Sequence, residues 1–320
     1  MSSARSVYKN KWLYIFLVVV VVCVGLFGWA TANSDSGRRF ERTNVQAALL
    51  PPSWWVHSVE QTTRVTDVRS GGSWYSVLGT DQLGRDIFAR CIVGGAISIS
   101  VGLFAACIAV IVGTVWGTIA GLRGGKTDEV MMRTVDILYG LPSIMLVVLI
   151  TVAANAMITG VEDISPFLEQ GIQVLSLLVA IGIVSWLTVS RVIRGQVRSM
   201  KARPSMEACK VVGVGSVRMF THHLFPALLG TIVVYTTLTV PTAILSEAFL
   251  SFLGIGIREP LPSWGNLAAD GLSQLNPVQS RWWLLAWPCL CIAVTLTCMN
   301  WIGQTLRKRV LKTSQGVQHA

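Results

Sequence analysis

The chain of 320 residues is 52% hydrophobic and only 13% charged. Because an average soluble domain is roughly 25% charged, this composition excludes an ordinary soluble globular protein and indicates a polytopic membrane protein. The formal net charge is +10, but the Lys and Arg residues flank apolar runs and do not form one stripe. That distribution argues against a nucleic-acid-binding surface.

The first apolar run, at about residues 12–30, follows Lys9 and Lys11 and is long enough to cross roughly 30 Å of hydrocarbon. A cleavable signal peptide is the alternative, since residues 30–32 (Ala-Thr-Ala) resemble a cleavage site. The run is longer than the roughly 7 to 15 residues of a signal sequence, which favours a permanent span. Residues 31–90 are polar and predict a long external segment.

Five more apolar runs follow, and basic clusters lie between alternate pairs of them. A short loop with Glu162, Asp163 and Glu169 but no Lys or Arg is expected outside, because cytoplasmic loops carry the excess of positive charge. The simplest solution is an all-α fold of six transmembrane helices with both termini in the cytoplasm. The later runs lie at about 97–121, 137–158, 172–189, 228–253 and 282–302.

The most informative stretch is the basic segment 191–226, with Glu207 as its only acid. It predicts an ordered cytoplasmic loop of two short helices joined by an elbow. Pro204 and Ser205 are a helix-start signal, and Gly213 and Gly215 interrupt the run. Ser216 is expected to cap a second helix that ends before Pro226. The cations of segment 191–226 are Arg191, Arg194, Arg198, Lys201, Arg203, Lys210 and Arg218.

This segment resembles the EAA loop of permease subunits of bacterial ABC importers. The pattern appears as Glu207-Ala208, then Gly213, then His223-Leu224-Phe225-Pro226. Cys209 replaces the second Ala of the pattern, and a His before an apolar pair and Pro is similar to the peptide-importer branch. The resemblance implies a coupling helix that docks on an ATPase subunit. It assigns this role to Glu207, Ala208, Cys209, Gly213, Gly215, His223 and Pro226.

Two other stretches, 79–86 and 247–271, closely resemble the C-type permeases of dipeptide and oligopeptide importers, and the likeness extends over about 78–303. It implies a type I importer fold with an N-terminal helix and external segment (1–90), a permease core (91–303) and a basic tail (304–320). The implied partners are a second homologous permease, two ATPase subunits, an external solute-binding protein and membrane lipid. The implied location is the bacterial cytoplasmic membrane.

Residues 120–127, AGLRGGKT, nearly spell a phosphate-binding loop. That loop requires a preceding strand, whereas an apolar span precedes this one, so we interpret it as a tight cytoplasmic turn. ATP and Mg²⁺ are therefore expected on partner subunits, with no enzymatic activity and no cofactor on this chain. The cysteines predict no disulfide framework. His57, His222, His223 and His319 are too scattered for a metal site.

An ion-coupled secondary transporter is the alternative function, but such carriers usually need ionisable residues inside the membrane. Only Asp136, Glu247 and Arg191 are candidates here. Glu247 is expected either to line the translocation path or, as we favour, to make a structural hydrogen bond. An ABC permease for nickel complexes or sugars would also fit the sequence, as would a membrane-anchored receptor or assembly factor.

Overall fold

The structure is a computed structural model, and it divides into two compact units. Unit 1 comprises Met1–Ile97 and Glu259–Cys291, and unit 2 comprises Ser98–Arg258 and Ile292–Ala320. The division falls inside two long helices, α3 (Ile87–Arg123) and α11 (Trp283–Gln318). The described residues are 31, 33–34, 37–38, 40–56, 59–70, 76–158, 165–204, 206, 211–213, 215–275 and 280–318.

Unit 1 contains the external segment and the loop before α11. Its elements are an antiparallel pair of two-residue strands, β1 (Asn33–Ser34) and β2 (Gly37–Arg38), the 3-10 turn η1 (Val45–Ala47), and the helices α2 (Val59–Ser70) and α10 (Trp264–Ser273). A capping box starts α10, because the side chains of Ser263 and Asn266 each bond the backbone N–H of the other. Unit 1 is thus folded in spite of its polar sequence.

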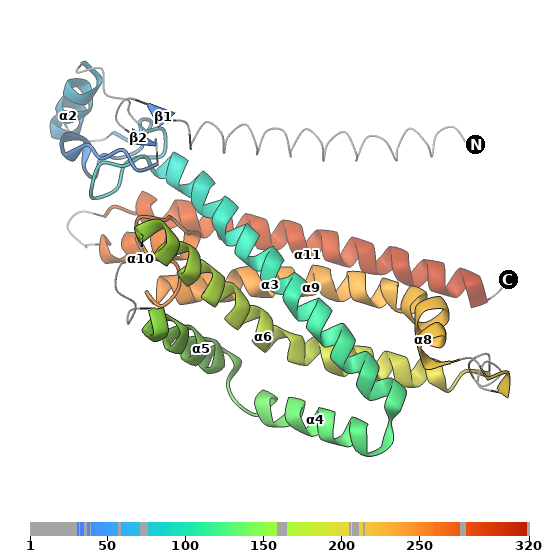
Figure 1. The fold of residues 1–320 in the computed structure, drawn as a ribbon. Coiled ribbons are helices and arrows are strands. Elements are labelled where there is room, and N and C mark those ends of the chain that lie inside the picture. The colour runs from blue at the N-terminus through green and yellow to red at the C-terminus, as the bar shows by residue number, and fades with distance from the viewer. Residues whose placement is uncertain are drawn as a thin grey trace, which may run out of the picture. The chain divides into compact units, whose positions relative to one another are not determined.

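Unit 2 is built of long helices (Figure 1). Its elements between α3 and α11 are α4 (Gly125–Tyr139), α5 (Ser143–Ile158), α6 (Pro166–Lys201), α8 (Ser216–Met219), the π turn η2 (Phe220–Leu224) and α9 (Phe225–Phe252). Four described helices are long and apolar enough to cross a membrane, or five spans if the bent pair α4 and α5 counts as one. The run 12–30 lies outside the described residues, so the sixth span and the cytoplasmic N-terminus stay predictions.

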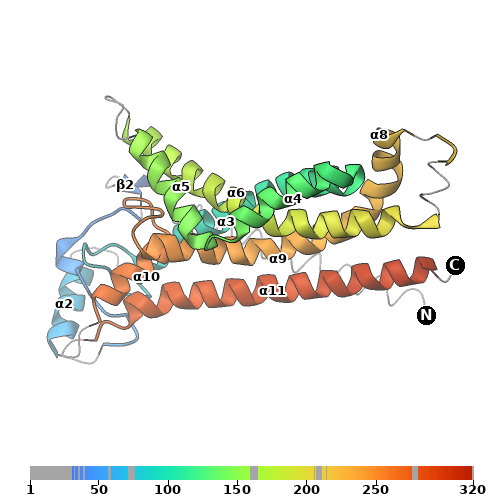
Figure 2. The same ribbon diagram turned by 90° about the horizontal axis from the view of Figure 1, so that it is seen from below.

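The third apolar run does not form the single helix that was expected at 137–158. Helix α4 ends at Tyr139, α5 begins at Ser143, and the two are bent by 87° (Figure 2). Pro142 explains the break, because it lacks an N–H and disfavours helical geometry at the residue before it. Residues 127–136 therefore belong to a helix that is separate from the following span.

The expectation that a loop begins at Arg191 is also wrong, since α6 continues to Lys201. The side chain of Ser165 caps its start by accepting from the N–H of Leu168, and Arg198 and Lys201 occupy its last turn. Positive charge at a helix C-terminus complements the helix dipole, so these cations stabilise the extension. The first eleven residues of the predicted loop, 191–201, are thus the end of a long helix.

The second short helix was expected to end before Pro226, and this prediction is wrong as well. The π turn η2 joins α8 to α9 without a break, and the N–H of Phe225 bonds the carbonyl of Phe220. A π turn widens the helix by one residue and shifts its hydrogen-bond register. Pro226 lies in the first turn of α9, directly after this shift in register.

Helices α3 and α6 pack through glycines spaced four apart on α3 (Gly113, Gly117 and Gly121). A Cβ on Gly117 would lie 2.4 Å from the carbonyl oxygen of Ser190, and one on Gly121 would lie 2.8 Å from Cβ of Val197. Small residues at this spacing let two helix backbones approach closely in a membrane. The cytoplasmic halves of α3 and α6, as the predicted topology orients them, are thus held in direct backbone contact.

Candidate functional site

The elbow predicted at 205–220 lies just after α6. Gly213 adopts the left-handed conformation, with φ of 78°, and a Cβ on it would meet no atom within 4 Å. The chain therefore needs glycine here for backbone conformation and not for space. Glu207, Ala208 and Cys209 lie outside the described residues. The rest of the predicted set falls near the bend, with Gly215 before α8, His223 in η2 and Pro226 at the start of α9.

Two methionines attach the elbow to the helices beside it. Met206 and Met219 are buried in one cluster with Val197 of α6 and Leu228 of α9. Because interior packing is close, movement of this cluster displaces the helix ends that it contacts. The elbow is therefore connected mechanically to α6 and α9.

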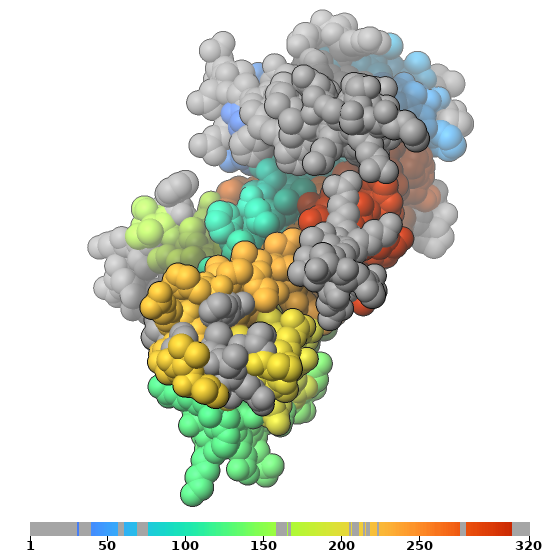
Figure 3. All heavy atoms as spheres, turned by 90° about the vertical axis from the view of Figure 1, so that its right-hand side faces the viewer, coloured from blue at the N-terminus to red at the C-terminus, as the bar shows by residue number. Residues whose placement is uncertain are grey.

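Two exposed valines at the elbow were missed by the sequence analysis. Val211 and Val212 are 88% and 80% exposed, and Figure 3 looks onto the end of unit 2 that carries them. Exposed apolar groups on other helices face what the composition identifies as lipid, but this pair lies between the end of α6 and the start of α8. Such a pair is typical of a protein contact. In the sequence the pair follows Lys210 and precedes Gly213.

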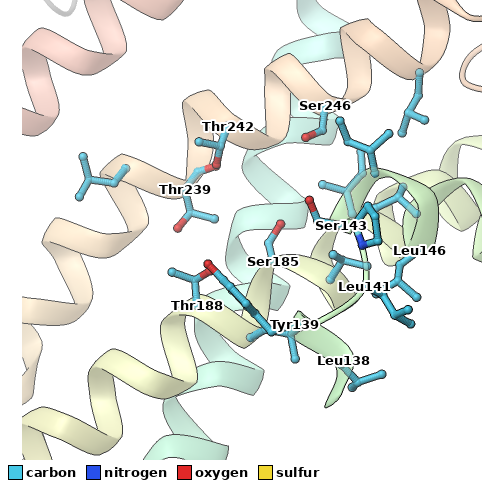
Figure 4. Close-up of a pocket in the computed structure, with 18 of the residues that line it drawn as sticks. Leu138, Tyr139, Leu141, Ser143, Leu146, Ser185, Thr188, Thr239, Thr242 and Ser246 are labelled. Atoms are coloured by element: carbon cyan, nitrogen blue, oxygen red, sulfur yellow. The ribbon is translucent and has the colours of Figure 1, made fainter. Parts of the chain in front are cut away.

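A cavity of about 640 Å³ opens among the bend between α4 and α5, the middle of α6 and the middle of α9. Figure 4 shows the hydroxyl groups of Ser143, Ser185 and Ser246 pointing into a common space. Thr188, Thr239, Thr242 and the Tyr139 ring extend this polar lining, and leucine, isoleucine and valine complete the wall. All of its lining residues are uncharged, so the cavity offers hydrogen bonds without fixed charge.

Glu247 is fully buried in α9 and lies outside the residues that line this cavity. The hydroxyl of Ser251 donates to its Oε1 at 2.8 Å, and the same hydroxyl accepts from the N–H of Ile257 at 3.0 Å. This chain of bonds fixes the C-terminal end of α9 to the turn after it. Its role in translocation stays a prediction, and the structure gives the side chain a structural hydrogen bond.

Within residues 120–127 the chain turns at Gly124 and Gly125, as the sequence predicts. Helix α3 precedes the turn, and Gly124 and Gly125 make it with φ of 66° and 54°. Among the described residues, no group of three or more His, Cys, Asp or Glu side chains is arranged to hold a metal ion.

Unit 1 contains an ion network that joins the two stretches singled out by their family resemblance. Arg85 Nε and Nη2 contact Asp81 Oδ2 and Glu259 Oε1, each at 2.6 Å. Arg90 is 1% exposed and contacts the same two carboxylates at 3.2 and 3.0 Å. Four charges that share their partners satisfy one another and make burial of Arg90 tolerable.

The network shifts the acidity of its outer members. Burial raises the pKa of Glu259, but hydrogen bonds and charges from Arg85 and Arg90 outweigh it and hold that pKa below its usual range. Asp270, on α10 nearby, has the opposite shift, because burial and the Glu259 charge raise its pKa. The network thus stabilises the ionised form of Glu259 at the expense of Asp270.

Apolar spans, an uncharged cavity among them and an exposed elbow at one end together define a multi-pass membrane transport protein. Residues 113–312 match the family described as "Binding-protein-dependent transport system inner membrane component". The chain belongs to this family of bacterial inner-membrane transport components, as its sequence resemblance implied.

Curated relatives extend the match over most of the chain. The oligopeptide transport system permease protein OppC of Bacillus subtilis is 36% identical over 92% of this chain and 82% of its own length. OppC of Escherichia coli K12 is 44% identical, over 72% of this chain and 70% of its own length. The dipeptide transport system permease protein DppC of B. subtilis is 36% identical, over 81% of this chain and 75% of its own length.

The fold is similar to that of a solved ABC importer. An inward-facing structure of the MetNI methionine ABC transporter superposes with a TM-score of 0.53 at 15% identity. The superposition covers 68% of this chain and 94% of the matched chain. The likeness confirms the fold class that the sequence predicted.

Proposed function

We propose that the chain is a permease subunit of an ATP-driven importer for dipeptides or oligopeptides. Support comes from the relatives, which are named for oligopeptide and dipeptide transport. The observation that carries the proposal is the uncharged, hydroxyl-lined cavity.

The cavity chemistry suits a peptide. Every peptide group has a donor and an acceptor, and serine and threonine hydroxyls can act as either. The volume of about 640 Å³ falls within the roughly 300–1,000 Å³ usual for small-molecule sites. Because the lining is uncharged, acidic and basic peptide side chains meet neither attraction nor repulsion from a fixed charge.

The proposed complex has a second homologous permease, two ATPase subunits and an external solute-binding protein. ATP and Mg²⁺ act on the ATPase subunits, and this chain performs no covalent chemistry and holds no cofactor or metal. Val211 and Val212 supply exposed apolar contacts for an ATPase surface. In this role Glu207, Ala208 and Cys209 complete the docking helix, and His223 and Pro226 start the helix that returns to the membrane.

Motion of the ATPase subunits would reach the cavity through the helices on either side of the elbow. Helix α6 enters the elbow and contributes Ser185 and Thr188 to the cavity, and α9 leaves it and contributes Thr239 and Thr242. A displacement of the elbow as one packed body tilts both walls together. The cavity can thereby open toward one side of the membrane and then the other.

Reconstitution tests the proposal. The complex should be purified through a tag on this chain in mild detergent, and the co-purifying subunits should be identified and placed in proteoliposomes. We expect two ATPase subunits and a second permease, and labelled peptide uptake that follows ATP and is indifferent to a proton or sodium gradient. Uptake driven by an ion gradient without ATP would contradict the proposal and favour a secondary carrier.

A substitution at the elbow tests the coupling role. Gly213→Val forces a branched side chain into the left-handed region, so uptake should be lost while membrane insertion is retained. Gly195→Ala in α6 is the matched control, because a Cβ there also meets nothing within 4 Å but φ is helical. Unchanged uptake by Gly213→Val would count against coupling through this bend.

A further inference from the structure

The basic residues of α6 form a row along α4. Arg191, Arg194, Arg198 and Lys201 are three or four residues apart and therefore share one face of the helix. Arg194 binds Asp128 with a two-pronged contact, Nε to Oδ1 at 2.5 Å and Nη2 to Oδ2 at 2.6 Å. Asp128 lies in the first turn of α4 and is 6% exposed. The pair therefore fastens the start of α4 to α6.

Contacts at the other end of α4 continue the row. Arg191 Nη2 lies 2.7 Å from Asp136 Oδ1, and its guanidinium carbon lies 4.0 Å from the centre of the Tyr139 ring. Lys201 donates to the carbonyl of Leu122, at the end of α3. The cations that mark the cytoplasmic side in the sequence are thus bound to α4 and to the end of α3.

Apolar contacts run parallel to the charges. Met132 and Val135 of α4 are buried in one cluster with Trp186 and Leu187 of α6. Trp116 of α3 stacks edge-on with Trp186, with ring centres 5.0 Å apart. With the glycine contacts between α3 and α6, these interactions make α4 and the adjoining ends of α3 and α6 one packed body.

This body connects the elbow to the cavity. At one end, α6 stops at Lys201, where the elbow begins. At the other end, Tyr139 and the bend residues Leu141, Pro142 and Ser143 line the cavity. A displacement of α6 reaches the α4 side of the bend if α4 moves with α6, and α5, which also packs against α6, holds the other side.

We propose that Asp128 and Arg194 are positioning residues that make α4 follow α6, so that elbow motion reaches the cavity through the bend between α4 and α5. The inference rests on the proposed function, and it adds a route from the elbow to the part of the cavity wall formed by the bend between α4 and α5. The two-pronged geometry suits the role, because parallel hydrogen bonds fix the angle between two helices as well as their distance.

The test compares Asp128→Asn with its neighbour Glu129→Gln in the reconstituted complex. Asp128→Asn removes the charge and one acceptor from the pair with little change in volume. Glu129 is exposed on the same helix and serves as the matched control. We expect peptide uptake per ATP hydrolysed to fall by about tenfold in Asp128→Asn, the size of a typical coupling free energy. Glu129→Gln should remain within about twofold of wild type.

A conservative variant and a second measurement separate positioning from simple stability. Asp128→Glu keeps the charge and should recover part of the lost ratio. Spin labels at exposed positions 133 on α4 and 196 on α6 should give one narrow distance that is unchanged by nucleotide in wild type and broad in Asp128→Asn.

Three results would overturn the inference. They are an unchanged uptake-to-hydrolysis ratio in Asp128→Asn, a loss of both activities in proportion to the amount of assembled complex, or an unaltered label distance in that variant. A wild-type complex that takes up peptide without ATP would instead contradict the proposed function. The label distance still tests the attachment of α4 to α6 in that case.

Discussion

The ion network of unit 1 and the Arg191–Asp136 pair of unit 2 use charge in opposite ways. In unit 1 the guanidinium of Arg90 is buried among shared carboxylates, with a side-chain exposure of 1%. In unit 2 the pair of Arg191 and Asp136 lies on the rim of the helices, where the two side chains are 36% and 59% exposed, while Asp128 is buried against Arg194. Interior contacts of unit 2 come from glycines and apolar side chains instead.

The difference shows what each arrangement can tolerate. A buried charge that loses its partner stays uncompensated, because water cannot reach it. An exposed charge that loses its partner is solvated by water instead. Unit 1 should therefore be rigid and intolerant of charge changes. Unit 2 can alter its rim contacts at small cost, which suits a region that has to move.

Arg90→Met should give the largest effect. It removes one of the two shared cations and leaves Asp81 and Glu259 with Arg85 alone, so we expect a loss of about 3–5 kcal/mol in the free energy of unfolding. The measurement is the midpoint of thermal unfolding in detergent. Arg258→Met is the control, since Arg258 is exposed beside Glu259. Equal midpoints for the two variants would contradict the contrast between the units.

Gly117→Val should have the next largest effect on stability. It tests helix packing, in which charge plays no part. The new Cβ would fall 2.4 Å from the Ser190 carbonyl oxygen, so α3 and α6 must separate. We expect a cost of about 1–3 kcal/mol, as for other overpacked interiors. Gly171→Val, in the open first turns of α6, is the control, because a Cβ there meets nothing within 4 Å.

The pH dependence of stability should sharpen the comparison through unit 1. Glu259 has a lowered pKa in the folded state, so its contribution is complete above the pKa of the unfolded chain and is lost as the pH falls through the folded value. Acidification should therefore lower the unfolding midpoint less in Glu259→Gln than in wild type. Asp270 has a raised pKa and the opposite sign, so Asp270→Asn should show a steeper loss in acid. Identical acid profiles in all three proteins would refute this assignment.

Arg191→Gln should have the smallest effect on stability. Its pair with Asp136 is solvent-exposed, and such pairs contribute about 0–1 kcal/mol. Thermal unfolding at low and high salt measures the change, and the difference from wild type should shrink as salt screens the pair. A loss as large as that of Arg90→Met would show that rim charges are structural after all.

The helices of unit 2 were largely predictable, but their ends were not. Apolar runs located α3, α6, α9 and α11, because crossing hydrocarbon requires a long apolar segment. Hydropathy locates only the part of a helix that crosses the hydrocarbon, and it does not show how far the helix continues beyond it. Arg191 to Lys201 consequently read as loop although they continue α6.

The elbow was predictable in part, and the cavity and ion pairs were not. Gly213 was recognisable because a local pattern demanded an unusual backbone conformation, which the structure has. The cavity hydroxyls come from distant stretches around Ser143, Ser185 and Ser246, each unremarkable by itself. Asp128 and Arg194 are 66 residues apart, and only the packing of α4 on α6 makes them partners.

The π turn before α9 makes the elbow sensitive to chain length. One residue corresponds to about 100° of rotation in an α-helix. Deleting one residue from Phe220–Leu224 would restore ordinary winding but swing α8 around the axis of α9 and turn its contact face away from any docked subunit. Across evolution, single-residue gaps should therefore be rarer in this turn than in the neighbouring loop, even where the side chains themselves vary.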